Sequence, residues 1–271
     1  TKKDIAKISF EGPEEELNKT QNTQICILTM SLAILEVLKK HNIDAQISSG
    51  LSLGEYTALI YSNILNLEEG IKIVQKRGEL MQNLVPKGNW SMAAIIGSDP
   101  NTVQEVCKNV KSGFVVPANY NCTGQIVISG EKEAVEEAME NLKTAGAKKA
   151  VILKTSGPFH TVKLSKAAEE LGKELENIHI QKTQKTVIKN IDGMPYKETD
   201  NIKEILQKHI ISPVQFEKTI NQMLQMGVDT FVEIGPGKTL SGFIKRTNKE
   251  VKILNINDAN TLEEAIKFLQ K

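Results

Sequence analysis

A serine with glycines two residues to either side, in Gly50-Leu-Ser-Leu-Gly54, is the most informative feature of this sequence. This spacing is typical of a nucleophile elbow, a sharp turn between a strand and a helix that exposes the serine hydroxyl. Glycines suit such a turn because they let the strand and helix backbones pass close together. The helix that follows would direct its amide dipoles toward a developing oxyanion. Ser52 is therefore the candidate nucleophile, although the pattern alone is weak and needs support from its context.

A serine nucleophile needs a base, and the sequence contains four histidines. His41 lies at the end of an expected helix and His179 alternates with isoleucines, so we interpret both as surface or packing residues. His160 follows Gly157-Pro-Phe behind an expected strand, where a turn would hold the ring at the strand-end face of a sheet. We weigh His160 equally as a catalytic base and as a turn or capping residue.

Arg77 lies on or beside the apolar face of an expected helix that is capped by Asn66 and continues to about Leu84. A guanidinium near a buried stripe needs an anionic partner, which is either a protein carboxylate or a ligand. The spacing alone slightly favours the protein ion pair. The residues expected to form the stripe are Leu67, Ile71, Val74, Met81 and Val85.

The composition describes an ordinary globular protein of 271 residues, of which 25% are charged. A net charge of +1 argues against a general binder of nucleic acids or membrane surfaces. The apolar run Ile25–Leu38 is short and interrupted by polar residues, so we expect a buried helix, and we see no secretion signal. We therefore expect a cytoplasmic protein.

Cysteine usage favours free thiols. The three cysteines, Cys26, Cys107 and Cys122, are odd in number and lack CxxC spacing. We expect small core residues in a reducing compartment, with no disulfide framework and no metal site.

The order of expected elements predicts two structural units. Segment 89–154 reads strand, helix, strand, strand, helix, strand, which is the order of a ferredoxin-like βαββαβ subdomain. Segments 1–88 and 155–271 alternate helices with strands and predict a discontinuous α/β domain with a mostly parallel sheet. In these two segments we expect helices at 23–41, 54–62, 66–84, 163–176, 201–209, 213–226, 239–246 and 261–269, and strands at 45–49, 185–190, 230–234 and 251–256.

Several motifs in register carry a family resemblance. With Gly50-Leu-Ser-Leu-Gly-Glu-Tyr and Arg77, the sequence resembles the malonyl-CoA:acyl carrier protein transacylases and the related acyltransferases of polyketide synthases, from about Glu11 to its end. The resemblance implies a large α/β-hydrolase-like domain with an inserted ferredoxin-like subdomain. The other motifs are Asn119-x-Asn121, Gln125-Ile-Val-Ile-Ser-Gly, Gly157-Pro-Phe-His, Ser212-Pro-Val-Gln-Phe and Glu233-Ile-Gly-Pro-Gly-Lys-x-Leu-Ser-Gly.

The resemblance also implies a reaction. A malonyl group would pass from malonyl-CoA to Ser52, and then to the phosphopantetheine thiol of an acyl carrier protein, without a cofactor. His160 would be the base, oriented by the main-chain carbonyl of His209, where family members usually have glutamine. The main-chain N–H of Leu53 would be an oxyanion donor. We expect a monomer that serves fatty acid or polyketide synthesis, with malonyl-CoA and the carrier protein as its partners.

The resemblance places three more residues at the acyl group. Arg77 would bind the free carboxylate of malonate through two hydrogen bonds. The resemblance therefore favours a ligand, rather than a protein carboxylate, as the anionic partner of Arg77. Asn121 would line the pocket. The ring of Phe159 would crowd a methyl branch, so malonyl is expected over methylmalonyl, with a preference of about 1–3 kcal/mol.

Two departures from the family pattern leave alternatives open. The residue before the nucleophile is normally histidine and is Leu51 here. Family members also open with a hydrophobic strand and a Gly-Gln-Gly loop that supplies a second oxyanion N–H, and nothing similar precedes Ile5 in this sequence. Losing one oxyanion donor costs about 10²–10³ in turnover. The alternatives are a non-catalytic relative that binds a carrier protein, and a serine esterase, which would leave Arg77 and the subdomain unexplained.

Overall fold

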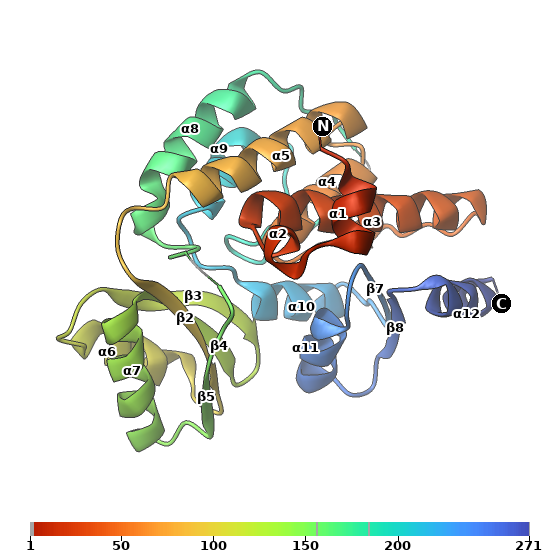
Figure 1. Cartoon of the computed structure of the whole chain (residues 1–271). Coiled ribbons are helices and arrows are strands. Elements are labelled where there is room, and N and C mark those ends of the chain that lie inside the picture. The colour runs from red at the N-terminus through yellow and green to blue at the C-terminus, as the bar shows by residue number, and fades with distance from the viewer. Residues whose placement is uncertain (1–2, 156, 184, 271) are drawn as a thin grey trace.

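The helices that position the site pack around α3 (Thr20–Lys40) and α5 (Leu67–Asn83), as the computed structural model in Figure 1 shows. The structure describes residues 3–155, 157–183 and 185–270. A Cβ at Gly78 of α5 would lie 2.9 Å from the Cα of Gln21, so this glycine permits the close approach of the two helices. By length and composition α3 could cross a membrane, but here Ile25 and Leu28 lie in the core.

The buried face of α5 differs from the expected stripe. The Asn66 side chain caps the helix by accepting a hydrogen bond from the Glu69 N–H at 2.8 Å. Leu67, however, is 55% exposed, so the stripe was wrong at this end. The buried residues of α5 are Gly70, Ile73, Val74, Arg77, Gly78 and Met81. Apolar spacing could not reveal this face, because its centre is formed by glycines and an arginine.

The strands of the large domain form two separate parallel pairs in the described part of the chain. Strand β1 (Ile47–Ser48) pairs with β6 (Thr186–Val187), and β7 (Thr230–Ile234) pairs with β8 (Lys252–Ile256). The parallel direction agrees with the alternation of helices and strands in the sequence. The two pairs are separate sheets, and residues of β1 and β7 line an apolar groove with a cavity volume of about 610 Å³.

Helices surround both pairs and differ from expectation in two places. Helices α1 (Ile5–Glu11) and α2 (Glu14–Leu17) contact α3 and were not expected from the sequence. Helix α10 begins at Phe216, three residues later than expected, because Val214 pairs with β3 of the subdomain. The remaining helices are α4 (Leu53–Tyr61), α8 (Ser165–Glu176), α9 (Ile202–His209), α11 (Thr239–Thr247) and α12 (Ala259–Leu269), with a 3₁₀ turn, η1, at Val162–Leu164.

The inserted subdomain has the expected ferredoxin-like topology. Its four strands are antiparallel in the order β3-β4-β2-β5, with α6 and α7 packed on the sheet. Two main-chain hydrogen bonds, Tyr120 N–H to Val214 O and Val214 N–H to Ala118 O, tie β3 to the large domain. The elements are β2 (Trp90–Ile96), α6 (Pro100–Asn109), β3 (Val115–Cys122), β4 (Gln125–Glu131), α7 (Lys132–Thr144) and β5 (Lys149–Ile152).

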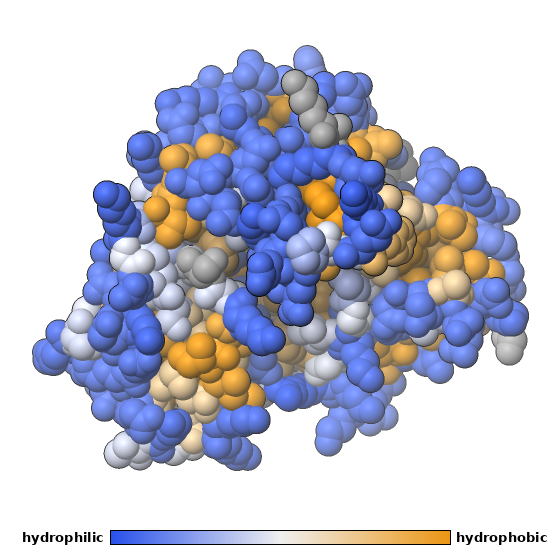
Figure 2. Space-filling view, viewed as in Figure 1, coloured by the Kyte–Doolittle hydropathy of each residue, from blue (hydrophilic) through white to orange (hydrophobic). Residues whose placement is uncertain are grey.

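The surface in Figure 2 is mostly hydrophilic, with apolar side chains in separate small areas, one of them on the subdomain. Exposed apolar residues include Val151 and Ile152 of β5. Among the described residues, Cys26, Cys107 and Cys122 are buried and free, and no cluster of potential metal ligands is found.

Candidate active site

The turn that carries Ser52 is an elbow between β1 and α4. Ser52 has φ 52° and ψ −99°, an unfavourable backbone conformation for a residue with a side chain, and α4 begins at the next residue. A Cβ at Gly50 would lie 2.2 Å from the backbone of Gly54, so only glycine fits at position 50. A Cβ at Gly54 would meet open space. The sequence suggested that both glycines let the strand and helix backbones pass close together. In the structure only Gly50 is required for this.

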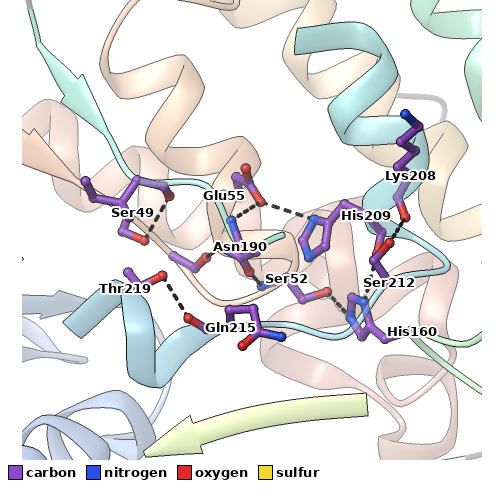
Figure 3. Close-up of polar contacts among 12 residues, drawn as sticks. Ser49, Ser52, Glu55, His160, Asn190, Lys208, His209, Ser212, Gln215 and Thr219 are labelled. Carbon is purple, nitrogen blue, oxygen red and sulfur yellow. Dashed lines mark hydrogen bonds and ion pairs between the residues drawn. The ribbon is translucent and has the colours of Figure 1, made fainter. Parts of the chain in front are cut away.

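Ser52 and His160 face each other in Figure 3, and the main chain of His209 lies behind the imidazole. Ser52 Oγ is 2.8 Å from His160 Nε2, and His160 Nδ1 is 3.1 Å from the carbonyl oxygen of His209. A carbonyl can only accept, so Nδ1 carries the proton and Nε2 is free to accept the serine proton. His160 has φ 59°, so both members of the pair lie in strained backbone of the kind that gathers at functional sites.

Arg77 points at the nucleophile from the buried face of α5. Its Nη2 donates to Ser52 Oγ at 2.9 Å and its Nη1 donates to Gln24 Oε1 at 2.6 Å. The side chain is 1% exposed, yet it takes part in none of the ion pairs found among the described residues. The protein ion pair that the spacing slightly favoured is therefore not what holds this guanidinium.

Of the remaining expected residues, Leu53 directly follows Ser52 in the chain and Phe159 directly precedes His160. Leu53 is the first residue of α4, so its N–H has no intrahelical acceptor and is available at the turn. Phe159 packs against both the core of the large domain and the Met92 cluster of the subdomain. Asn121 lies on β3, 5% exposed, and its side-chain oxygen has no partner in the described part of the chain.

Sequence reasoning missed Asn190, which holds the elbow from the neighbouring strand. The Ser52 N–H donates to Asn190 Oδ1 at 2.6 Å, and Asn190 Nδ2 donates to the Gly50 carbonyl at 2.7 Å. A signal was its place as the last residue of the expected strand 185–190, because the carboxyl ends of parallel strands meet at one edge. Gln24 directly precedes the apolar run Ile25–Leu38 and was not considered, and Glu55 was read only as part of the motif.

The electrostatics of the site keep His160 neutral. Burial, and then the positive charge of Arg77, lower the pKa of His160 to about 4. The imidazole is thus unprotonated at pH 7 and can accept a proton from Ser52. Burial also lowers the pKa of Arg77 from its ordinary value, and its guanidinium lies 5.3 Å from the centre of the Tyr56 ring, a cation–π contact. The chain can therefore activate an alcohol next to a fixed positive charge.

Comparisons with known proteins show the family of this chain. The family model described as "Acyl transferase domain" matches residues 4–267. The malonyl CoA-acyl carrier protein transacylase of Bacillus subtilis is 42% identical over 269 residues, which are 98% of this chain and 85% of that protein. That of Staphylococcus aureus strain MSSA476 is 40% identical over 263 residues, with 96% and 84% covered.

Solved structures give the same result. The crystal structure of malonyl CoA-acyl carrier protein transacylase from Clostridium perfringens has a TM-score of 0.94 and 46% identity, and the match covers 99% of this chain and 85% of that one. A malonyl-transacylase in complex with its type II polyketide synthase acyl-carrier protein has a TM-score of 0.93 and 37% identity, covering 98% and 86%. This chain belongs to the acyltransferase family of the malonyl CoA-acyl carrier protein transacylases.

Proposed function

We propose that the protein transfers a malonyl group from malonyl-CoA to the phosphopantetheine thiol of an acyl carrier protein through a malonyl ester of Ser52. The observation that carries this proposal is the buried Arg77, which donates to Ser52 Oγ and has no carboxylate partner among the described residues. A carboxylate on the acyl group would supply the missing anion. We further propose that the protein works in the cytoplasm, for fatty acid or polyketide synthesis, without a cofactor.

In the first half-reaction, Ser52 Oγ attacks the thioester carbonyl while His160 Nε2 takes the hydroxyl proton. The Leu53 N–H stabilises the oxyanion, aided by the N-terminal end of α4. The bond to sulfur breaks, and the CoA thiolate receives the proton from His160. The His209 carbonyl, 3.1 Å from Nδ1, stabilises the imidazolium that forms between these two proton transfers.

In the second half-reaction, the thiol of the carrier protein attacks the malonyl-serine carbonyl. His160 takes the thiol proton and then gives it to Ser52 Oγ as the ester bond breaks. Arg77 holds the malonate carboxylate throughout and so keeps the reacting carbonyl over Ser52. The relative whose structure contains an acyl-carrier protein supports a carrier protein as the acceptor.

Incubation with radiolabelled malonyl-CoA tests the proposal. We expect label on Ser52 in the denatured protein, located by peptide mass spectrometry, and passage of that label to a holo acyl carrier protein. Label that passes only to water would indicate a hydrolase. Absence of any label on the chain would instead favour a non-catalytic relative that binds carrier proteins.

The acid limb of the pH profile should lie far below the ordinary histidine value. Because the pKa of His160 is lowered to about 4, we expect kcat/KM for malonyl-CoA to fall only as the pH drops through about 4. Once malonate offsets the charge of Arg77, the pKa should rise, so the limb of kcat lies at higher pH. Steady-state rates at pH values from about 3.5 to 8 locate the acid limb in the kcat/KM profile and the acid limb in the kcat profile. If the acid limb lay at the ordinary histidine pKa in both profiles, burial would not lower the pKa of His160 as we expect.

Shortening Phe159 should relax selectivity for the acyl group. Phe159 directly precedes His160, and its ring packs against both the core of the large domain and the Met92 cluster of the subdomain. We expect Phe159→Leu to raise the ratio of methylmalonyl to malonyl transfer about 10-fold, because the room for one methyl group is worth about 1–3 kcal/mol. Competition between the two CoA esters measures this ratio. The exposed Phe10 offers a control, since Phe10→Leu should leave the ratio unchanged.

A further inference from the structure

A buried carboxyl group lies directly behind the nucleophile turn. Glu55, in the first turn of α4, is fully buried. Its Oε1 accepts a hydrogen bond from the Tyr196 hydroxyl at 2.5 Å, and its Oε2 accepts one from the Asn190 N–H at 3.3 Å. The same Oε2 lies 3.1 Å from His209 Nδ1. Figure 3 shows the carboxyl between Asn190 and His209.

Two of the three neighbours of this carboxyl, Asn190 and His209, also hold the reacting pair. The Asn190 side chain binds the Ser52 N–H and the Gly50 carbonyl, so it fixes the turn that presents the hydroxyl. The main-chain carbonyl of His209 orients the His160 ring. Glu55 thus contacts both supports of the Ser52–His160 pair, one on each side.

The side chain of His209 has no other partner in the described part of the chain. Its ring is 1% exposed, and neither ring nitrogen has a well-aligned hydrogen bond there. The distance from Nδ1 to Glu55 is that of a hydrogen bond, although the angle is poor. The centres of the His209 and His160 rings are 5.1 Å apart. An aligned hydrogen bond at this contact would satisfy a buried nitrogen.

We propose that Glu55 and His209 share one proton in a buried hydrogen bond, and that through this bond both side chains act as positioning residues for Ser52 and His160. In the protonated carboxyl form, Glu55 donates to Nδ1. In the ionised form, Nδ1–H donates to the carboxylate, so either form keeps the bond. A glutamine in place of His209 would also carry an amide N–H able to donate to the carboxylate.

The charge states of the two groups agree with one shared proton. Burial raises the pKa of Glu55 to about 7, against the opposing effect of the Tyr196 hydrogen bond. Burial, and then the charges of His160 and Arg77, hold the pKa of His209 well below its ordinary value. With the carboxyl protonated and the imidazole neutral, the pair places no net charge in the core.

Covalent labelling of Ser52 by a fluorophosphonate tests the pair, because this probe needs neither CoA nor a carrier protein. The inference rests on the proposed function only in taking Ser52 as the nucleophile. We expect Glu55→Gln and His209→Leu each to lower the rate of labelling about 10-fold or more, since small misplacements of reacting groups are costly. The double variant should be no slower than the slower single variant, because both changes break one bond. His209→Gln should recover part of the rate.

A second glutamate–histidine pair on the surface provides the matched control. His179 Nδ1 lies 3.0 Å from Glu69 Oε1, and the His179 side chain is 86% exposed. Glu69→Gln and His179→Leu remove the same chemistry away from the site and should leave the labelling rate unchanged. With malonyl-CoA, the two site variants should lower kcat and leave KM nearly unchanged.

Several results would overturn the proposal. One is a rate of Ser52 labelling within twofold of wild type for both single variants. Another is a loss of rate in the double variant that equals the product of the losses in the two single variants. Nitrogen NMR of the unmodified protein gives a decision even where a variant does not fold, because a His209 Nδ1 with the shift of a free nitrogen would exclude the bond. If wild-type Ser52 accepts the fluorophosphonate but no malonyl group, the transferase proposal fails, while the positioning proposal is still decided by the rates.

Discussion

Replacing Arg77 by alanine should reduce malonyl transfer about 10²–10⁴-fold while sparing the transfer of uncharged acyl groups. The guanidinium is buried beside Ser52 Oγ, and two hydrogen bonds to a carboxylate would be lost, each worth about 1.5–3 kcal/mol. An acetyl group has no carboxylate, and its transfer also benefits from a site relieved of an unpaired charge. The measurement is the ratio of malonyl-CoA to acetyl-CoA turnover on the same carrier protein.

The chain contains a single other arginine, Arg246, which is exposed and serves as the control. Arg246→Ala should leave the acylation of Ser52 by either CoA ester unchanged. An equal loss of malonyl and acetyl transfer in Arg77→Ala would show that Arg77 acts on the serine alone, and the assignment of a carboxylate partner would fail.

Replacing Ser52 by alanine should abolish transfer, with a loss of at least about 10⁴-fold and no malonyl ester on the chain. His160 would then have no alcohol to deprotonate, and a direct attack by the carrier thiol on malonyl-CoA would lack its covalent step. The backbone at φ 52° strains alanine and serine alike, so the fold should persist. Intact-mass spectrometry after incubation with malonyl-CoA detects the ester, and circular dichroism checks the fold.

Ser49 provides a matched control three residues away. Its hydroxyl donates to the Ile188 carbonyl at 3.3 Å and does not contact the reacting pair. Ser49→Ala should therefore keep both the ester and the transfer rate. Persistence of a malonyl ester in Ser52→Ala would refute the proposed nucleophile.

Local signals in the sequence predicted much of the fold. Strand β7 has its expected bounds, Asn66 caps α5 as expected, and the six elements of the subdomain occur in the expected order. These features depend on residues close together in the sequence, such as a capping side chain and its helix. The division of the parallel strands into two pairs depends on long-range pairing, and no local pattern reports it.

The site was harder to predict from the sequence than the fold, because the residues that hold Ser52 in place are distant from it in the sequence. Ser52 and Asn190 are 138 residues apart and Glu55 and Asn190 are 135 apart, so neither contact follows from spacing. The position of Arg77 could be narrowed only to the apolar face of its helix. Whether a carboxylate of the chain reaches it is a question of tertiary packing, and the described residues supply Gln24 and Ser52 instead.

The position of Phe159 between the two units has an evolutionary consequence. The Phe159 ring contacts the core of the large domain and also the inserted subdomain. The subdomain begins with β2 and ends with β5, which are hydrogen-bonded neighbours. An inserted subdomain whose two ends lie side by side can be exchanged as a unit, because the path of the surrounding chain does not have to change. A swap of segment 89–154 would then change the residues that pack beside Phe159, while Ser52, His160 and Arg77 lie outside the exchanged segment.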